Sequence, residues 1–383
     1  MKCLRCGNER YFFKDHGSWY CQKCVSYGRL DVGLFPEKPI LSKQIIQIKP
    51  KLKYPLTQRQ SLVSQQIIHY LKQGMDVFLY AATGAGKTEC TLGAIVEYLS
   101  QGKKVGFAIS RRQVVLEIAD RLQTIFPTLH VVPVAQGYTN QTDGDLIVCT
   151  MHQLYRYPFT FDLLVMDEID AFPYAGDECL HCIANQSCVG QKLCLSATPD
   201  QENMDLIEQG KMKMVSLFER PHKHLLPVPE VYKGPILFQI YWLIHFCSLF
   251  IKEKKQILLF VPTKQAAQTM GSICSLFTKV CVVHSQVKNR DEIIAHFRNK
   301  EMNICITTTL LERGITLPSV QVIVWNGEHE VFTTASLVQI FGRVGRSFTD
   351  PEGRGIYLCQ KKSLAIGQCI SLIQTMNQSV QCV

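Results

Sequence analysis

A loop with the residue types of a phosphate-binding site lies near residue 85. The chain reads YAATGAGKTE there, so that Thr83, Gly84, Ala85, Gly86, Lys87 and Thr88 stand between an apolar run and an amphipathic stretch. Glycines let backbone N–H groups turn toward phosphate oxygens, while the Lys and Thr supply a positive charge and a hydroxyl ligand for Mg²⁺. We therefore predict a nucleotide site at a helix start, with Lys87 on the β- and γ-phosphates and Thr88 on the metal.

Three carboxylates follow a second apolar run in FDLLVMDEIDAF, at Asp167, Glu168 and Asp170. Clustered acids are most often solvated loop residues. A Mg-nucleotide seated on Lys87, however, needs an acid at the tip of a neighbouring strand. We predict that Asp167 holds the magnesium ion and that Glu168 orients and activates the attacking water. Asp170 is predicted to tie this strand to the next motif.

Four of the 17 cysteines have the spacing of a metal site. Cys3 with Cys6, and Cys21 with Cys24, form two C-x-x-C pairs separated by 14 residues. Two such pairs on tight turns direct four thiolates to one point, which predicts a structural zinc site. A second group has helical spacing, more typical of packing than of metal binding, and comprises Cys179, His181, Cys182 and Cys188.

Positive charge is concentrated in the first 55 residues. The chain has a formal net charge of +9, and this segment alone carries 11 Lys or Arg against 4 Asp or Glu. Aromatic residues are interleaved with the basic ones, at Tyr11, Phe12, Phe13, Trp19 and Tyr20. Such a mixture suits phosphates and stacked bases. The alternative is that the rings form the small core of a zinc module.

From Leu56 onward, short apolar runs alternate with amphipathic stretches, and the alternation resumes after a proline-rich break at 220–235. This rhythm predicts an α/β protein with parallel sheets and helices on both sheet faces. We predict a zinc-binding module over residues 1–30, a linker with room for one strand over 31–55, a first lobe over 56–220, an interlobe linker over 221–235 and a second lobe over 236–383.

The composition, 46% apolar and 19% charged, is that of a globular protein, and the chain shows no secretory signal pattern. Its most membrane-like stretch, Pro235 to Ile251, has 17 residues and contains Gln239, His245 and Ser248. A spanning helix needs roughly 20 apolar residues. We therefore expect a buried helix that opens the second lobe, and a cytoplasmic protein.

The order of the motifs resembles the helicase superfamily that includes the DEAD-box proteins, from Thr57 to Arg346. The matching segments are LTQRQ, the phosphate loop, DEID, SAT, TTTLLERGITLP and QIFGRVGR. The resemblance implies two RecA-like lobes, ATP as the nucleotide and Gln60 as the reader of adenine. It further implies that SAT, at 196–198, couples hydrolysis to lobe movement, and that the second lobe supplies Glu312, Arg313, Gly314, Gln339, Arg343 and Arg346.

In this superfamily Gln339 would face the nucleotide cleft, while Arg343 and Arg346 would meet the γ-phosphate. An arginine that arrives from the opposite lobe stabilises developing charge only when the cleft closes, which links hydrolysis to motion. The resemblance also implies phosphate contacts to nucleic acid from both lobes, through Arg112, Thr150, His152, Thr307 and Thr308.

The four-cysteine module, DEIDAFPYAGD and TMHQLYRY together resemble the ComFA family of late competence ATPases. That likeness implies an ATP-driven motor on single-stranded DNA that helps draw in transforming DNA, in the cytoplasm or peripheral at the inner face of the cell membrane. Implied partners are a ComFC-like protein, a DNA uptake channel and a single-strand loading protein. The alternatives are a primosome-type DNA helicase and an ATP-gated nucleic-acid clamp that does not translocate.

Overall fold

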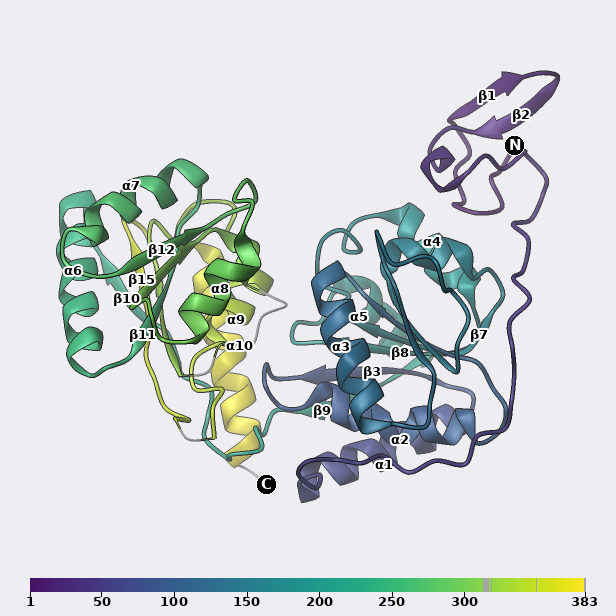
Figure 1. Cartoon of the computed structure of the whole chain (residues 1–383), viewed down its shortest axis with the longest axis horizontal. Coiled ribbons are helices and arrows are strands. Elements are labelled where there is room, and N and C mark those ends of the chain that lie inside the picture. The colour runs from purple at the N-terminus through teal and green to yellow at the C-terminus, as the bar shows by residue number, and fades with distance from the viewer. Residues whose placement is uncertain (313–316, 318, 349, 382–383) are drawn as a thin grey trace. The chain divides into compact units, whose positions relative to one another are not determined.

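A computed structural model describes residues 1–312, 317, 319–348 and 350–381. The chain forms two compact units, one made of Met1–Ala81 and Lys87–Leu217 and the other of Ala82–Gly86 and Phe218–Val383. The first unit holds a two-stranded ribbon and a seven-stranded sheet, and the second holds a six-stranded sheet (Figure 1). The predicted fold class, two RecA-like lobes behind a four-cysteine module, is confirmed.

The N-terminal module is a short hairpin followed by one helical turn: β1 (Phe12–Asp15), β2 (Ser18–Cys21) and the 3₁₀-helix η1 (Val25–Tyr27). His16 and Gly17 form the hairpin turn, with φ of 45° and 87°. Positive φ at both central positions is characteristic of a type I′ turn, whose backbone twist matches that of the flanking strands. The hairpin brings Cys21 back beside the first C-x-x-C pair.

The first lobe is a parallel sheet in the strand order β5-β6-β4-β7-β8-β3-β9, with flanking helices. Its elements are α1 (Gln58–Lys72), β3 (Asp76–Ala81), α2 (Lys87–Leu99), β4 (Val105–Ile109), α3 (Arg112–Ile125), β5 (Val131–Val134), β6 (Leu146–Thr150), the 3₁₀-helix η2 (Met151–Arg156), β7 (Phe161–Asp167), α4 (Glu178–Ser187), β8 (Cys188–Ser196), α5 (Gln201–Glu208) and β9 (Met212–Leu217).

Local sequence explains these elements. Every residue of β7 except Asp162 is buried, as expected for a central strand covered on both faces. In α3 the buried residues Val115, Ile118, Ala119 and Leu122 recur every three to four positions and form one apolar stripe. Burial of each large aliphatic side chain contributes about 1.5–3 kcal/mol. Packing of these side chains in the core of the lobe therefore holds the strands in place. It thereby fixes the positions of the last residue of each strand.

The second lobe is a parallel sheet in the order β10-β15-β14-β11-β13-β12. Its elements are β10 (Glu230–Lys233), α6 (Ile236–Lys252), β11 (Gln256–Phe260), α7 (Lys264–Ser275), β12 (Val280–Val283), α8 (Arg290–Arg298), β13 (Ile304–Thr307), the 3₁₀-helix η3 (Thr309–Leu311), β14 (Val320–Val324), α9 (Thr334–Phe341), β15 (Gly355–Cys359) and α10 (Leu364–Gln381).

Helix α6 differs from the buried helix predicted for its sequence. One face packs through Leu243, Phe246 and Phe250, but Leu237 and Phe238 near its start are 75% and 59% exposed. Because the apolar run continues around the whole helix, the sequence does not indicate that only one side of the helix packs against the sheet. No helix within the described ranges is both long and apolar enough to cross a bilayer.

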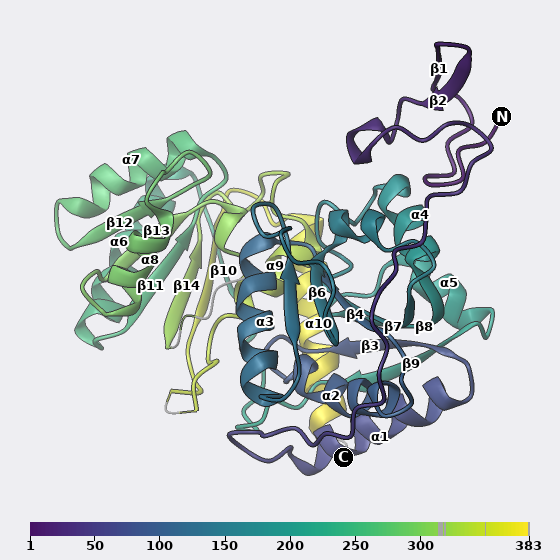
Figure 2. The same cartoon turned by 45° about the vertical axis from the view of Figure 1, so that its right-hand side comes forward.

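The segment predicted as a linker lies along the surface of the first lobe and forms no strand of its own over 31–55. Figures 1 and 2 show it as a purple trace from the N-terminal module down the side of this lobe to α1. The Nζ of buried Lys104 donates to Ser42 O at 2.9 Å, to Asp143 Oδ1 at 2.9 Å and to Gly144 O at 2.6 Å. Further along, Ile46 N donates to Leu99 O at 3.1 Å. The segment is therefore a strap held by the lobe.

Candidate nucleotide, zinc and nucleic-acid sites

The phosphate loop connects β3 to α2, as its sequence predicts. Gly84 and Gly86 adopt φ of 81° and 88°, a region that residues with a Cβ rarely enter, so the loop needs glycine at both positions. Ala85 N donates to Ala82 O at 3.1 Å, which closes a tight turn. Helix α2 begins at Lys87, and its first N–H groups are available to an anion.

Lys87 and Asp167 meet across the carboxyl ends of the parallel strands, with Lys87 Nζ 3.6 Å from Asp167 Oδ1. Asp167 also accepts a hydrogen bond from Glu168 N at 2.9 Å. Glu168 has φ of 54°, an unfavourable region for a residue with a side chain, at a cost of about 1–3 kcal/mol. Such strain is typical of functional positions. The loop Lys, the strand-end acid and the strained Glu thus form one group, together with the Thr88 hydroxyl at the second position of α2.

Asp170 is connected to the SAT segment, which confirms the role predicted for it. Thr198 Oγ1 donates to Asp170 Oδ2 at 2.7 Å, and Ser196 Oγ donates to Thr198 O at 2.7 Å. This hydrogen bond gives the acidic segment and the SAT segment a direct link. Gln60 is buried near the start of α1, where its Oε1 accepts from Thr57 N at 2.9 Å in a capping box.

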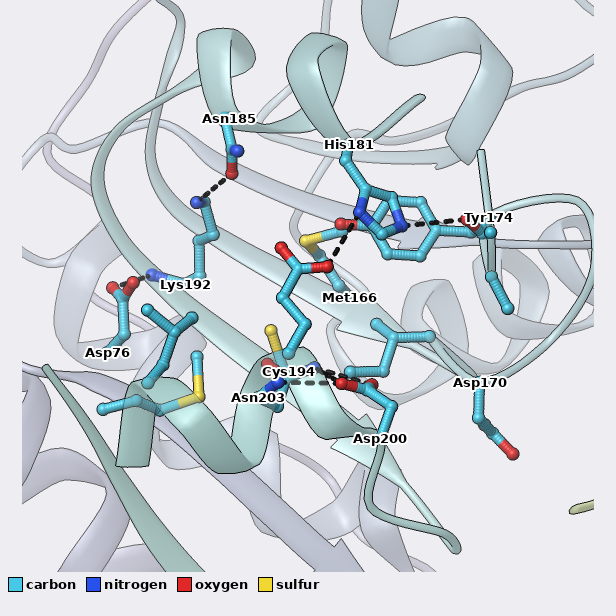
Figure 3. Close-up of a pocket in the computed structure, with 16 residues that line it drawn as sticks. Asp76, Met166, Asp170, Tyr174, His181, Asn185, Lys192, Cys194, Asp200 and Asn203 are labelled. Carbon is cyan, nitrogen blue, oxygen red and sulfur yellow. Dashed lines mark hydrogen bonds and ion pairs between the residues drawn. The ribbon is translucent and has the colours of Figure 1, made fainter. Parts of the chain in front are cut away.

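A cavity of about 270 Å³ lies beside this link, between the sheet and helices α4 and α5 (Figure 3). His181 stacks on Tyr174 with ring centroids 4.4 Å apart and pairs with Glu202 at 2.9 Å. Lys192 Nζ donates to Asn185 Oδ1 at 2.5 Å. Because these polar groups satisfy one another, the cavity is part of the packing behind the acidic segment.

The four predicted zinc ligands converge. Sγ atoms of Cys3, Cys6, Cys21 and Cys24 all lie within 4.8 Å of one another, with Cys3–Cys24 at 3.7 Å and Cys6–Cys21 at 3.6 Å. Zn–S bonds of about 2.3 Å in a tetrahedron put sulfurs about 3.8 Å apart. All four are buried and unbridged, so the donor set fits a zinc ion.

Polar side chains surround these sulfurs. Asn8 Nδ2 donates to Cys21 Sγ at 3.5 Å, and Arg5 Nη1 lies 3.9 Å from Cys24 Sγ. Donors of this kind stabilise thiolates and tune a metal centre from its second layer of contacts.

The second cysteine group does not form a metal site among the described residues. Cys179, on α4, packs in the same cluster as the zinc ligands. The Sγ of Cys182 lies so near Gly7 that a Cβ on Gly7 would come within 3.0 Å of it. The thiol of Cys188 instead donates a hydrogen bond to Gln191 O at 3.4 Å, within β8. The packing interpretation therefore holds, and α4 is the surface on which the zinc module rests.

The QIFGRVGR motif of the second lobe spans the end of α9 and the loop that follows it. Gln339 is in α9, and Arg343 and Arg346 come directly after it, with Arg346 Nε donating to Gly342 O at 3.0 Å. Ser336 Oγ, also in α9, donates to Glu312. Arg313 and Gly314 lie outside the described residues.

Arg220 is a residue of this region that sequence reasoning missed. Its Nη1 donates to Val344 O at 2.8 Å and to Gly345 O at 3.0 Å, and its Nη2 donates to Gly342 O at 2.9 Å. Burial, together with the nearby Arg346 charge, lowers the pKa of Arg220 to about 9. The Arg220 side chain thus bonds three carbonyls of the loop that carries both motif arginines. The only local signal is a lone Arg before the proline-rich break.

The residues predicted to bind nucleic acid lie at the same strand ends as the nucleotide residues. In the first lobe, Ile109 of β4 is in register with Thr150 of β6 on one side and with Asp167 of β7 on the other. His152 follows in η2, and Arg112 is the exposed first residue of α3. The predicted nucleic-acid contacts therefore begin two strands away from the acidic segment.

In the second lobe, the two predicted threonines end β13 and begin the next turn. Thr307 is fully buried and its Oγ1 bonds Thr308 O at 3.0 Å, whereas Thr308 is partly exposed. Of the two side chains, that of Thr308 is the one placed to meet a ligand.

Comparison with known families agrees with this arrangement. Residues 61–207 match the DEAD/DEAH box helicase family, and residues 241–348 match the helicase conserved C-terminal domain. A solved structure of the Mycobacterium smegmatis helicase Lhr, bound to ssDNA and AMP-PNP, superposes with a TM-score of 0.61 at 15% identity, over 83% of this chain and 48% of Lhr. The chain is thus an ATP-dependent enzyme of the superfamily 2 helicase type.

Two curated relatives are similar over nearly the whole chain. The competence protein ComFA of Bacillus subtilis is 32% identical over 98% of this chain and 86% of its own length. ComFA of Streptococcus pneumoniae is 30% identical, over 98% of this chain and 90% of its own length. The chain belongs to the ComFA family of competence proteins.

Proposed function

We propose that this protein is a DNA-dependent ATPase that moves along single-stranded DNA and thereby helps to take up transforming DNA. The register of Thr150, Ile109 and Asp167 across three adjacent strands carries the proposal. Thr150, proposed to contact DNA, ends β6, and Asp167, proposed to hold magnesium, ends β7, on the two sides of β4. A movement of the backbone at the DNA contact could therefore be transmitted to the magnesium ligand through one intervening strand.

ATP and magnesium are the cofactors that fit this donor set. Lys87 and the N-terminus of α2 would hold the β- and γ-phosphates, and residues 83–86 would surround them. Thr88 and Asp167 would hold the metal. Gln60 would contact the adenine base. Bound Mg²⁺ would neutralise charge on the phosphates. Glu168 would accept the proton of the attacking water, and Gln339, Arg343 and Arg346 would complete the site. Gly314 is proposed to contact the nucleotide as well.

Nucleic acid would be held by Arg112, Thr150 and His152 in the first lobe and by Thr307 and Thr308 in the second. The relatives named as competence proteins support a role in transformation, and the ssDNA bound to Lhr supports a single strand as the substrate. We propose a ComFC-like protein, the DNA uptake channel and a single-strand loading protein as partners. The site of action would be the cytoplasm or the inner face of the cell membrane.

A comparison of ATPase rates tests this proposal. ATP hydrolysis should be stimulated strongly by single-stranded DNA, weakly by duplex DNA and weakly by RNA of the same sequence. For a motor that travels, the maximal rate should rise with the length of the DNA between about 10 and 100 nucleotides. Stimulation by RNA alone, or no stimulation at all, would contradict the proposal.

The same measurement separates a translocase from an ATP-gated clamp. A clamp hydrolyses ATP once per binding event, so its maximal rate at saturating DNA would not change with DNA length. A flat length dependence with strong single-strand stimulation would therefore assign the protein to the clamp class. Duplex unwinding without such stimulation would favour the primosome-type helicase.

A further inference from the structure

A groove of about 500 Å³ lies where the zinc module and the strap meet the first lobe. Its walls come from three parts of one compact unit. They are the zinc module with Tyr27 and Arg29, the strap with Leu34 and Phe35, and the end of η2 with Tyr155 and Arg156.

The groove continues from the residues predicted to bind nucleic acid. Thr150 immediately precedes η2, His152 is its second residue, and Tyr155 and Arg156 end it. At about 2 Å of rise per residue in a 3₁₀-helix, His152 and Arg156 are about 8 Å apart along the axis. A strand that contacts His152 therefore reaches the groove within a few nucleotides.

Aromatic rings join the zinc module to this path. The ring of Tyr27 lies 5.2 Å from that of Tyr155 and 6.4 Å from that of His152, measured between centroids. On the strap side, Phe35 is 63% exposed and lies 5.9 Å from Phe159. Phe35 offers an exposed face, and the half-buried rings of Tyr27 and Tyr155 line the groove, so that unpaired bases of any sequence can stack there.

The positive charge in the groove is not cancelled by its own acids. Arg156 Nε donates to Gln153 Oε1 at 2.6 Å, and its guanidinium lies 5.0 Å from the Tyr155 ring centroid, but no ion pair of Arg156 occurs among the described residues. Arg5, in contrast, is buried and directed to the zinc module, with its Nη1 3.9 Å from Cys24 Sγ and donating to Gly28 O at 2.6 Å. Arg29 likewise pairs with Asp15 and Asp31, so that Arg156 carries the charge available to a ligand. Glu37 is the one acid of the lining.

We propose that this groove holds a single strand of nucleic acid beyond the two lobes, with unpaired bases stacked on Tyr155 and Tyr27 and a backbone phosphate on Arg156. The inference rests on the proposed function, because it needs a strand that passes Thr150 and His152. It assigns the zinc module the role of a second wall around that strand. Short strands would be held by the lobes alone, and longer ones would also occupy the groove.

The test measures equilibrium binding of labelled oligo(dT) of 8 and 30 nucleotides to the full chain. Arg156→Ala should weaken binding of the 30-mer about tenfold and that of the 8-mer less than twofold. For the 30-mer the slope of log K against log salt should also fall by about 0.7, the value expected for one lost phosphate contact on a single strand. Tyr155→Leu should weaken 30-mer binding by a similar factor, and Tyr155→Phe should bind normally because stacking is kept.

Matched controls lie on the second lobe, outside the groove. Arg298→Ala and Tyr241→Leu remove an exposed Arg and an exposed Tyr and should leave both affinities within about twofold. One zinc per chain and an unchanged circular dichroism spectrum would show that each variant is folded.

Unchanged 30-mer binding in Arg156→Ala and Tyr155→Leu would overturn the groove proposal and leave the contact as a plain interface between module and lobe. Equal losses for the 8-mer and the 30-mer would overturn it too. In both cases the proposed function survives if single-stranded DNA still stimulates the wild-type ATPase. Failure of the wild-type protein to bind either oligonucleotide would remove both proposals.

Discussion

The two lobes share one architecture but differ in the charge near their motif ends and in how that charge is fixed. In the first lobe, Lys87 and Asp167 are placed by neighbouring elements of the sheet and are 3.6 Å apart. In the second, Arg343 and Arg346 lie in a loop whose carbonyls accept hydrogen bonds from Arg220. Strand register therefore fixes Asp167, whereas the arginine loop is held by hydrogen bonds of its own backbone and by the Arg220 side chain.

This difference suggests different tasks. A site built on paired strands changes little when other parts of the chain move, which suits the binding of a metal and a nucleotide. A loop that is not part of a paired strand can shift more readily, which suits groups needed only in the transition state.

The largest expected effect concerns the first lobe. Lys87→Ala and Glu168→Gln should each lower kcat for ATP about a thousandfold or more, because phosphate charge or water activation is lost. Binding of a fluorescent ATP analogue should separate them, since Lys87→Ala should lose affinity and Glu168→Gln should retain it. Lys72→Ala, at the exposed end of α1, is the control. Normal hydrolysis by Glu168→Gln would mean that another group activates the water.

A second effect would test the other half of the comparison. Arg346→Ala should lower kcat about a hundredfold or more while the affinity for ATP changes less than threefold, because its charge is needed mainly in the transition state. Arg298→Ala, an exposed Arg at the end of α8, should have normal rates. If Arg346→Ala weakened ATP binding as strongly as it lowered kcat, the proposed division between binding and transition-state groups would be wrong.

The strap should contribute to the stability of the first lobe alone. Lys104→Met leaves three buried or partly buried oxygens without their donor and should reduce the unfolding free energy by about 2–4 kcal/mol. Lys103→Met, at the exposed neighbouring position, should change it by less than about 0.5 kcal/mol.

Hydrogen exchange of β4 and β6 during urea unfolding would measure the loss of stability in the first lobe. In a Trp19→Phe background, fluorescence of Trp242 and Trp325 would report on the second lobe alone. Equal shifts in both probes would show that the lobes unfold together.

The link between Asp170 and Thr198 should have a smaller effect. Thr198→Val keeps the shape of the side chain but removes the 2.7 Å hydrogen bond. We expect the basal ATPase to stay within about twofold and the stimulation by DNA to fall about fivefold, because the acidic segment and SAT would no longer move together. Thr198→Ser, which keeps the hydroxyl, should behave as wild type. Full stimulation in Thr198→Val would place the coupling elsewhere.

The smallest effect is a pH dependence in the first lobe. Burial disfavours the charged form of Asp143, but hydrogen bonds from Ser42 and Lys104 outweigh it and lower the pKa of this carboxyl to about 2. A lowered pKa adds stability above the ordinary value near 4, and this stability is lost as the pH falls toward 2.

Asp143→Asn should thus be less stable than wild type at pH 6, by an amount that solvent screening keeps small. The difference should shrink below pH 4 in chemical unfolding. A constant difference between pH 6 and pH 3 would show that the charge of Asp143 does not stabilise the lobe.

Sequence reasoning was strongest where chemistry is encoded by short spacing. The two C-x-x-C pairs and the apolar runs before Lys87 and Asp167 predicted the four-sulfur cluster and the parallel strands, because each pattern is local. It was weakest where a contact joins distant residues. The bonds of Lys104 to Ser42 and of Arg220 to the arginine loop have no local signature, and α6 has a run of apolar residues that cannot reveal which face is covered.

The Lys104 contacts also bear on how this protein can be shortened. A chain begun at Leu56 would look reasonable, since it keeps every helicase motif. It would, however, remove the carbonyl of Ser42, one of the three acceptors of the Lys104 ammonium group, and uncover the amino ends of β4, β6 and β7, which the strap contacts. Such a fragment should be prone to aggregate, so biochemical studies of the motor alone should retain residues from about Leu41 onward.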